Sequence, residues 1–247
     1  MRVMSSTLGH PRLHLRLPDS TNDRARALAI AGAAHGTLVT ASSQSAGRGR
    51  HGRRWSAPPD SALLASLVLR GSPPPRLLPL IAAVAVCDAV EHSQTGERAQ
   101  IKWPNDVVFV RSSDAPGEHL AKLAGILAEG RPQEGWAVLG IGLNVAVRLE
   151  ELPTELQATA ATLGESPEQI EPTLACLLTA LDRRLAEPTE ELLEAYRARD
   201  ALRGREIGWS GGSGRAEGID GEGRLVVALR GGGHTTLDAG EVHLQPA

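Results

Sequence analysis

Nine consecutive residues, from Gly47 to Trp55, combine the residue types that bind a compact anion. They are Gly-Arg-Gly-Arg-His-Gly-Arg-Arg-Trp, within a 247-residue chain whose formal net charge is −3. Arginine presents a planar pair of N–H donors to a carboxylate or phosphate, and tryptophan presents a face for stacking. Glycine lets the backbone approach a ligand closely. The segment therefore predicts an anion-binding loop.

Two other interpretations of this loop rest on its charge alone. A run of arginines is often a solvated surface loop, and an Arg-Gly segment can hold nucleic acid without sequence preference. A nucleic-acid-binding module is disfavoured because the chain is acidic overall, aromatic residues make up only 2% of it, and no second basic cluster occurs. Polar residues elsewhere in the chain decide between these interpretations.

Polar residues beside predicted strands are candidates to meet the loop. In Ile101-Lys102-Trp103-Pro104-Asn105-Asp106, the proline and the residues after it predict a turn, so Asn105 and Asp106 are either turn formers or ligands. Lys122 precedes an apolar strand, where it is either a charge that protects a strand edge or an anion ligand. The glycine spacing in Gly140-Ile141-Gly142-Leu143-Asn144 is typical of a strand that another group approaches closely.

Ser20, Thr21 and Asn22 have two roles open to them. With Asp23 three residues after Ser20, the segment resembles a capping box, which predicts a helix that starts here and runs to Ala34. The same side chains are exposed donors at a helix start and can equally bind a ligand.

The elements that must position these residues alternate between strand and helix patterns. Apolar alternation and β-branched runs predict strands in the first half, and leucines at helical spacing predict helices after Arg148. From about Leu202, Gly-rich turns separate five short strand candidates, which is typical of a small β-barrel. The expected elements are strands Leu13–Leu17, Thr37–Ala41 and Ala62–Leu69, helix Leu77–Val90, hairpins over Ile101–Val110 and Lys122–Val147, helices Glu171–Ala186 and Thr189–Asp200, and strands Arg205–Trp209, Gly214–Ile219, Arg224–Leu229, His234–Leu237 and Glu241–Leu244.

Composition indicates the compartment and the kind of core. Hydrophobic residues are 41% and charged residues 22% of the chain, as in ordinary globular domains. Cys87 and Cys176 both fall in apolar, helix-like runs without metal-ligand spacing, so both are expected to be buried thiols. Neither a membrane span nor a secretory signal is recognised, which predicts a cytoplasmic protein without a membrane partner.

In combination, these motifs resemble those of bacterial biotin–protein ligases. The order and approximate spacing of that family are matched by Ser20–Asn22, Gln44–Arg50, Trp55, Lys102–Asp106, Lys122–Leu127 and Gly140–Asn144. The resemblance implies an α+β fold, with a central mixed β-sheet, helices packed on it and a small SH3-like β-barrel at the C-terminal end. It divides the chain into a biotin/ATP-binding catalytic domain, 1–201, and an SH3-like domain, 202–247.

The resemblance also implies an enzyme that uses biotin and ATP as substrates with Mg²⁺. Such an enzyme activates biotin as biotinyl-5′-AMP and transfers it to a lysine of its partner, a biotin carboxyl carrier protein. The catalytic positions are matched by Lys122, Arg50 and Asp106, the last as base or orienting carboxylate in the transfer. The biotin-binding positions are matched by Ser20, Thr21, Asn22, Gln44, Arg48, Gly49, Arg50 and Lys122. The ATP or adenylate positions are matched by Arg48, Arg50, Arg53, Trp55, Asn105, Lys122 and Asn144, and no metal ligand is assigned.

Two functions of related proteins, lipoate or octanoate attachment and DNA binding, are alternatives to biotin–protein ligation alone. Lipoate and octanoate ligases and transferases share the catalytic fold and are the alternative, although the transferases need a nucleophilic cysteine near a lysine. Relatives that double as repressors carry an N-terminal helix-turn-helix, and the residues before Leu13 are too few to form one, so no DNA binding is expected. The oligomeric state stays open, a homodimer included.

Overall fold

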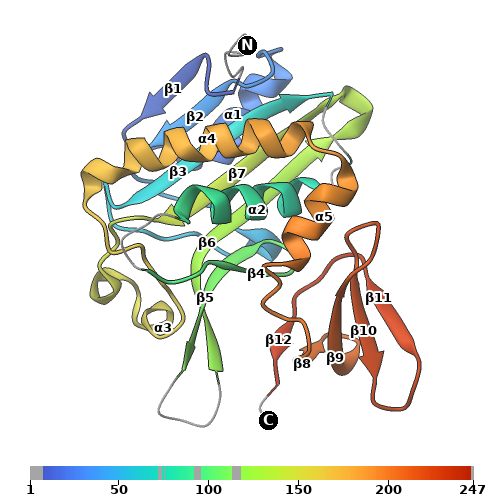
Figure 1. Ribbon diagram of the computed structural model, residues 1–247. Helices are drawn as coiled ribbons and strands as arrows, with labels where there is room; N and C mark the ends of the chain where they lie inside the picture. The colour runs from blue at the N-terminus through green and yellow to red at the C-terminus, as the bar shows by residue number, and fades with distance from the viewer. Residues whose placement is uncertain (1–7, 72–73, 75, 92–95, 113–117, 246–247) are drawn as a thin grey trace.

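The molecule is built on a seven-stranded mixed β-sheet (Figure 1). The structure, a computed structural model, describes residues 8–245 apart from 72–73, 75, 92–95 and 113–117. The strands of this sheet are β1 (Arg12–Leu15), β2 (Leu38–Ala41), β3 (Ala62–Arg70), β4 (Gln100–Lys102), β5 (Asp106–Ser112), β6 (Glu118–Arg131) and β7 (Trp136–Asn144). Their spatial order is β1-β2-β3-β7-β6-β5-β4. The β1–β2 pair is parallel and the other neighbours are antiparallel, which confirms the expected mixed sheet.

Helices cover both faces of this sheet. The α-helices of the described chain are α1 (Thr21–Ile30), α2 (Leu78–Val90), α3 (Thr154–Gln157), α4 (Ile170–Ala186) and α5 (Thr189–Arg197). In Figure 1, α2 and α4 cross the front of the sheet and α1 lies behind it. Strand alternation explains this division, because Leu67 enters the main core with α2, whereas Val68 packs with Ala25 and Ala29 of α1. Within the described ranges, no helix is long and apolar enough to span a bilayer.

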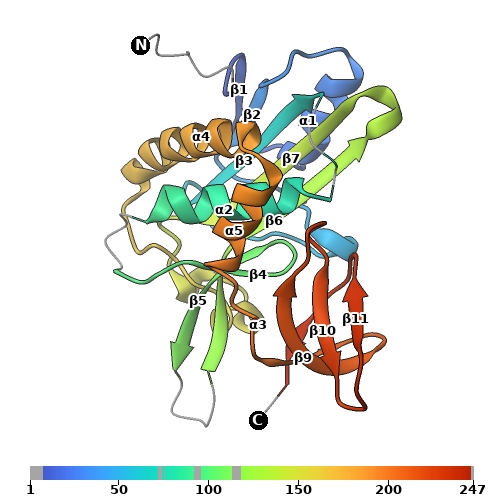
Figure 2. The same ribbon diagram turned by 45° about the vertical axis from the view of Figure 1, so that its right-hand side comes forward.

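The C-terminal segment forms a second, antiparallel sheet. Its strands are β8 (Glu206–Trp209), β9 (Gly212–Ile219), β10 (Leu225–Leu229), β11 (His234–Leu237) and β12 (His243–Leu244), in the order β11-β10-β9-β8-β12. All five expected strands are confirmed, and the sheet lies next to α5 and β4 (Figures 1 and 2). Trp103 is 2% exposed, and its Nε1 donates to Gly223 O at 3.1 Å. This tryptophan therefore ties the two sheets together.

The prediction that both cysteines are buried is wrong for one of them. Cys87 is buried on α2, and desolvation raises the pKa of its thiol to about 12. Cys176 is exposed on α4. The buried stripe of α4 runs through Leu174, Leu177 and Leu181, at the spacing of one helix face, and Cys176 lies off it.

Candidate active site

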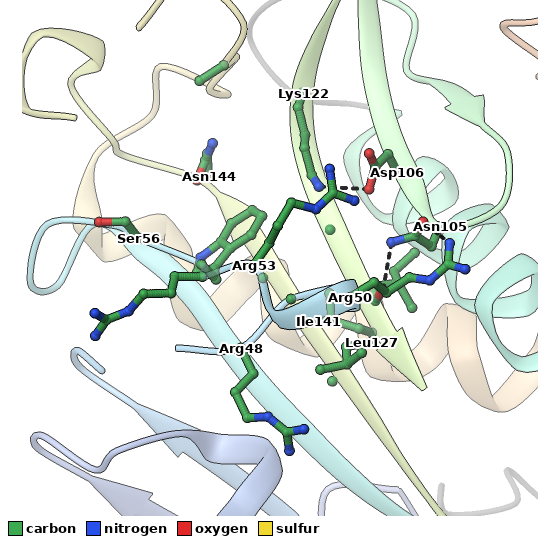
Figure 3. Close-up of a pocket in the computed structure, with 18 of the residues that line it drawn as sticks. Arg48, Arg50, Arg53, Ser56, Asn105, Asp106, Lys122, Leu127, Ile141 and Asn144 are labelled. Atoms are coloured by element: carbon green, nitrogen blue, oxygen red, sulfur yellow. Dashed lines mark hydrogen bonds and ion pairs between the residues drawn. The ribbon is translucent and has the colours of Figure 1, made fainter. Parts of the chain in front are cut away.

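A cavity of about 440 Å³ opens on the face of the central sheet that α1 covers. Strands β6 and β7 form its floor, and the start of α1 and the 47–55 loop form its rim (Figure 3). Every residue that the motifs single out as a ligand lines it: Ser20, Thr21, Asn22, Gln44, Arg48, Gly49, Arg50, Arg53, Trp55, Asn105, Asp106, Lys122 and Asn144. The fold thus brings the predicted site residues into one place.

Three glycines, Gly125, Gly140 and Gly142, keep the floor of the cavity flat. A Cβ at Gly142 would lie 2.5 Å from Trp55 Cε2, and one at Gly125 would lie 2.9 Å from Trp55 Cζ3. A Cβ at Gly140 would overlap Asn22 Oδ1. Because strand residues alternate between faces, Gly140 and Gly142 share one face. The glycine spacing of β7 therefore seats the side chains of Trp55 and Asn22.

We expect Gly142→Ala to displace the Trp55 ring, because the new methyl group would lie inside its van der Waals radius. If this ring is the adenine-stacking face, ATP binding should weaken by about tenfold, the equivalent of an aromatic contact of about 1.4 kcal/mol. Calorimetric titration with ATP measures the change. Gly221→Ala is the matched control, since a Cβ there meets nothing within 4 Å. Unchanged ATP affinity in Gly142→Ala would contradict the stacking role of Trp55.

One end of the cavity is a network of neutral polar side chains around the start of α1. Gln44 Oε1 accepts from the Thr21 backbone N–H at 2.7 Å and from Thr21 Oγ1 at 3.1 Å. Ser66 Oγ, in the buried centre of β3, lies 2.9 Å from Thr21 Oγ1 and 2.7 Å from Asn22 Oδ1. Ser20 is the N-cap residue, but its side chain makes no capping hydrogen bond. The capping-box prediction is therefore wrong, and Gln44 caps the helix instead.

The other end of the cavity gathers cations around two carboxylates. These residues are Arg50, Arg53, Lys102, Lys122, Asp106 and Glu241. Lys122 Nζ lies 2.7 Å from Asp106 Oδ1 and 5.8 Å from the centre of the Trp55 ring (Figure 3). The ammonium of Lys122 therefore lies between the carboxylate of Asp106 and the face of the Trp55 ring.

The C-terminal sheet contributes to this cationic end. Arg53 forms an ion pair with Glu241, in the connection between β11 and β12. Arg50 Nη1 donates to Asn105 Oδ1 at 2.9 Å and to Gly240 O at 3.3 Å. Two arginines of the loop are therefore oriented by a segment that follows them by nearly 190 residues.

A β-bulge lets β6 present Lys122 to the cavity. The register of β6 against β5 shifts between Lys122 and Ala124, which leaves Leu123 as the extra residue. Leu123 and Ala124 are both buried in the main core, whereas Lys122 and Gly125 both line the cavity. Strict alternation would have placed Lys122 and Gly125 on opposite faces.

The pKa values of three charged groups at this end, Lys102, Arg50 and Glu241, are shifted. Desolvation lowers the pKa of Lys102, against the attraction of Asp106, and desolvation also lowers the pKa of Arg50. Burial alone would raise the pKa of Glu241, but the attraction and hydrogen bond of Arg53, together with the charges of His243 and Lys102, outweigh it and the pKa is lowered. Partly desolvated cations interact strongly with an anion that enters beside them. Such cations are typical of an anion-binding site.

Lys102 and Glu241, which line the cavity, and Glu129, which pairs with the lining residue Arg48, are not among the residues that the motifs predict. Lys102 had a usable signal, because the predicted turn places it directly opposite Asp106. In addition, Lys102 and Lys122 are the only lysines among the 26 Lys and Arg residues of the chain. Glu129 and Glu241 pair with loop arginines from distant parts of the sequence, and no local pattern indicates either contact.

The chain is similar to known proteins over most of its length. Residues 15–145 match the family described as biotin/lipoate A/B protein ligase. The chain is 35% identical over 246 residues to the biotin–[acetyl-CoA-carboxylase] ligase of Mycobacterium tuberculosis, covering 92% of this chain and 86% of that protein. It is 34% identical over 244 residues to the protein of the same name from Paracoccus denitrificans, covering 91% and 96%.

A solved structure shares the whole architecture. The biotin protein ligase from Aquifex aeolicus in complex with biotin and ATP superposes with a TM-score of 0.78 at 26% identity. The match covers 96% of this chain and 100% of that one, so it includes the C-terminal sheet as well as the cavity. Fold, motifs and sequence identity agree, and the chain belongs to the biotin/lipoate A/B protein ligase family, among the biotin–protein ligases.

Proposed function

We propose that this protein joins biotin to a carrier protein in two steps. It first makes biotinyl-5′-AMP from biotin and ATP, and it then transfers the biotinyl group to a lysine of a biotin carboxyl carrier protein in the cytoplasm. One observation carries the proposal: a single cavity has a neutral hydrogen-bonding end at Thr21, Asn22 and Gln44 and a cationic end at Arg50 and Lys122. The first suits the ureido ring of biotin, and the second suits a carboxylate beside a phosphate.

The cationic end fits the needs of the first step. Attack of the biotin carboxylate on the α-phosphorus of ATP brings two anions together, so their repulsion must be reduced. Arg50, Lys102 and Lys122 surround the space in which this happens and stabilise the charge that develops there. Because Asn105 and Gly240 already orient the guanidinium of Arg50, little reorganisation of this cation is needed.

The nucleotide has a binding place between Trp55 and Asn144. Asn144 Nδ2 donates to Ala161 O at 2.8 Å, whereas its Oδ1 is buried and has no hydrogen-bond partner within the described chain. A buried unpaired acceptor is costly, and an adenine amino group would satisfy it while the base stacks on the Trp55 indole.

Magnesium is expected to enter with the nucleotide. The described residues hold no group of three or more His, Cys, Asp or Glu side chains suited to a metal. In nucleotide sites Mg²⁺ is held largely by phosphate oxygens and water, with one or two carboxylates, of which Glu241 at the cationic end can supply one. When bound, it neutralises phosphate charge and orients the leaving pyrophosphate.

The alternative acyl group, lipoate or octanoate, has less support from the structure. A transferase of that kind needs a reactive cysteine beside the lysine of the site. Cys87 and Cys176 lie on α2 and α4, across the sheet from the cavity, and the thiol of Cys87 has a pKa of about 12. Neither thiol can reach Lys122.

We also propose that the catalytic domain spans 1–201 and the SH3-like domain spans 202–247. The cavity is almost wholly a product of the first, with Glu241 as a contribution from the second. Under this division, the smaller domain supports the loop that carries Arg50 and Arg53.

Mixing the protein with ATP, biotin and a purified carrier domain tests the function. We expect the mass of the carrier to rise by one biotinyl group, and intact-protein mass spectrometry measures it. Parallel reactions with lipoate in place of biotin, and without ATP, should leave the carrier unmodified. Modification by lipoate alone would overturn the proposal in favour of the alternative acyl group.

A further inference from the structure

Ser66 places a hydroxyl in the middle of β3, whose sequence is Ala-Leu-Leu-Ala-Ser-Leu-Val-Leu-Arg. The residue is fully buried. Strand alternation puts it on the same face as Leu64, which lines the cavity, and Val68, which packs against α1. A buried hydroxyl is costly unless it is hydrogen-bonded. The partners of Ser66 therefore indicate what a serine does at this position of an apolar strand.

Three oxygen–oxygen contacts at the neutral end of the cavity share two hydroxyl protons. The contacts are Thr21 Oγ1–Gln44 Oε1 at 3.1 Å, Thr21 Oγ1–Ser66 Oγ at 2.9 Å and Ser66 Oγ–Asn22 Oδ1 at 2.7 Å. Each hydroxyl has one proton, and an amide oxygen has none. The carboxamide of Asn22 cannot be turned over, because its Nδ2 donates to the carboxylate of Glu129 at 3.0 Å. One of the three contacts must therefore lack a proton.

The hydroxyl of Thr21 has a choice of two acceptors. When it donates to Gln44 Oε1, both lone pairs of that oxygen are used, because the Thr21 backbone N–H takes the other. When it turns to Ser66 Oγ, Ser66 donates to Asn22 Oδ1, and the contact without a proton is the longest of the three. Gln44 Oε1 then keeps a free lone pair at the cavity, which Gln44 lines.

We propose that Ser66 is a positioning residue that makes the neutral end of the cavity select an acyl group with N–H donors. By accepting the Thr21 proton, Ser66 leaves Gln44 Oε1 free to accept a ring N–H of a cyclic urea. An acyl group without such donors, lipoate or octanoate for example, leaves this acceptor unpaired. A site of that kind rejects the analogue more strongly than a difference in size would. The inference rests on the proposed function, since it takes biotin as the cyclic urea.

Ser66→Ala tests this role, because alanine leaves the Thr21 proton only Gln44 as a partner. The quantities measured are the dissociation constants, by calorimetric titration, of biotin and of a biotin analogue that keeps the thiolane ring and the acyl chain but lacks the urea. We expect biotin to bind about tenfold more weakly, the equivalent of one lost hydrogen bond, and the analogue to change by less than about twofold. In pyrophosphate release, the KM for biotin should rise by the same factor while kcat stays nearly constant.

Two further variants separate the hydroxyl from the packing of the strand. Ser61→Ala is the matched control, because Ser61 is 7% exposed just before β3 and its Oγ donates to Pro58 O at 2.7 Å, outside this network. It should leave both dissociation constants unchanged. Ser66→Cys fills the space with a thiol, which is a weak acceptor, and should weaken biotin binding in the same direction as alanine. Thermal unfolding verifies that each variant is folded.

A double variant tests the direction of the proton itself. In the wild type, Thr21→Val removes a hydroxyl of the neutral end and should weaken biotin binding by about tenfold. In Ser66→Ala, the same change removes the proton that occupies Gln44 Oε1, so it should weaken binding no further. The two substitutions are therefore expected to be strongly non-additive.

The outcomes that overturn the inference differ from those that overturn the function. Wild-type biotin affinity in Ser66→Ala, or an equal loss for biotin and the urea-free analogue, would reduce Ser66 to a packing residue. Additive losses in the double variant would show that Thr21 does not turn its proton toward Ser66. A wild-type protein that fails to biotinylate the carrier domain contradicts the proposed function itself, whatever the dissociation constants.

Discussion

Replacing Lys122 with alanine should lower biotin-dependent pyrophosphate release by on the order of 10³-fold. The ammonium of Lys122 lies 2.7 Å from Asp106 and faces the space where the carboxylate and the phosphate must meet. Without it, two anions approach with one fewer cation between them, and Asp106 loses its ion-pair partner. A pyrophosphate-release assay with saturating biotin and ATP measures the effect.

The competing role for Lys122, a charge that protects a strand edge, predicts a different result. Such a charge is worth at most about 0.5 kcal/mol of stability and nothing in catalysis. Arg131→Ala, at the exposed end of the same strand, is the control for loss of a β6 cation and should keep the wild-type rate. If Lys122→Ala also keeps that rate, the lysine has no part in adenylation.

The second large effect is expected at Asp106, in the transfer step. A carrier lysine with a reference pKa of about 10.4 is mostly protonated at pH 7, so its attack on the adenylate needs proton removal and a nearby anion to attract the ammonium. Asp106 sits at the start of β5 with its side chain 17% exposed, in the cavity. Asp106→Asn should slow biotin transfer to the carrier by on the order of 10²-fold.

The two half-reactions should respond unequally in Asp106→Asn. Lys122 loses an ion-pair partner but keeps its charge, so pyrophosphate release in a single turnover should change much less than transfer from preformed adenylate. Rapid-quench measurement of each step gives both rates, with Asp238→Asn, an exposed aspartate of the second sheet region, as the control. Equal losses in both steps would place Asp106 with the metal or the scaffold, and no loss in either would leave it a turn former.

Much of the fold follows from local pattern. The helix Leu78–Val90 and the strand Ala62–Arg70 are each one residue from the predicted bounds, because a continuous apolar run flanked by turn residues leaves few alternatives. The glycines of β7 were predicted to mark a close approach, and the structure shows Trp55 and Asn22 as the side chains that approach. The predicted site residues came together because each stands at a strand end, a helix start or a loop that faces one side of one sheet.

The features of the site that the sequence does not predict depend on strand register and on contacts between segments that are distant in the sequence. The bulge at Leu123 decides that Lys122 and Gly125 share a face, and nothing in an apolar strand pattern indicates an extra residue. The ion pairs of Arg48 with Glu129 and of Arg53 with Glu241 join segments that only tertiary packing brings together. Cys176 was placed in the core because an apolar run does not specify which of its residues lies off the buried stripe.

The confinement of both lysines to the cavity limits what the protein can do to itself. An acyl adenylate that escapes reacts with neutral amines, and a guanidinium, which stays protonated, is a poor target. The other 24 of the 26 basic side chains are arginines, so the described surface outside the cavity offers no side-chain amine. Self-labelling on side chains is therefore confined to Lys102 and Lys122, and the side-chain products of an amine-directed reagent would report on the cavity and on whatever occupies it.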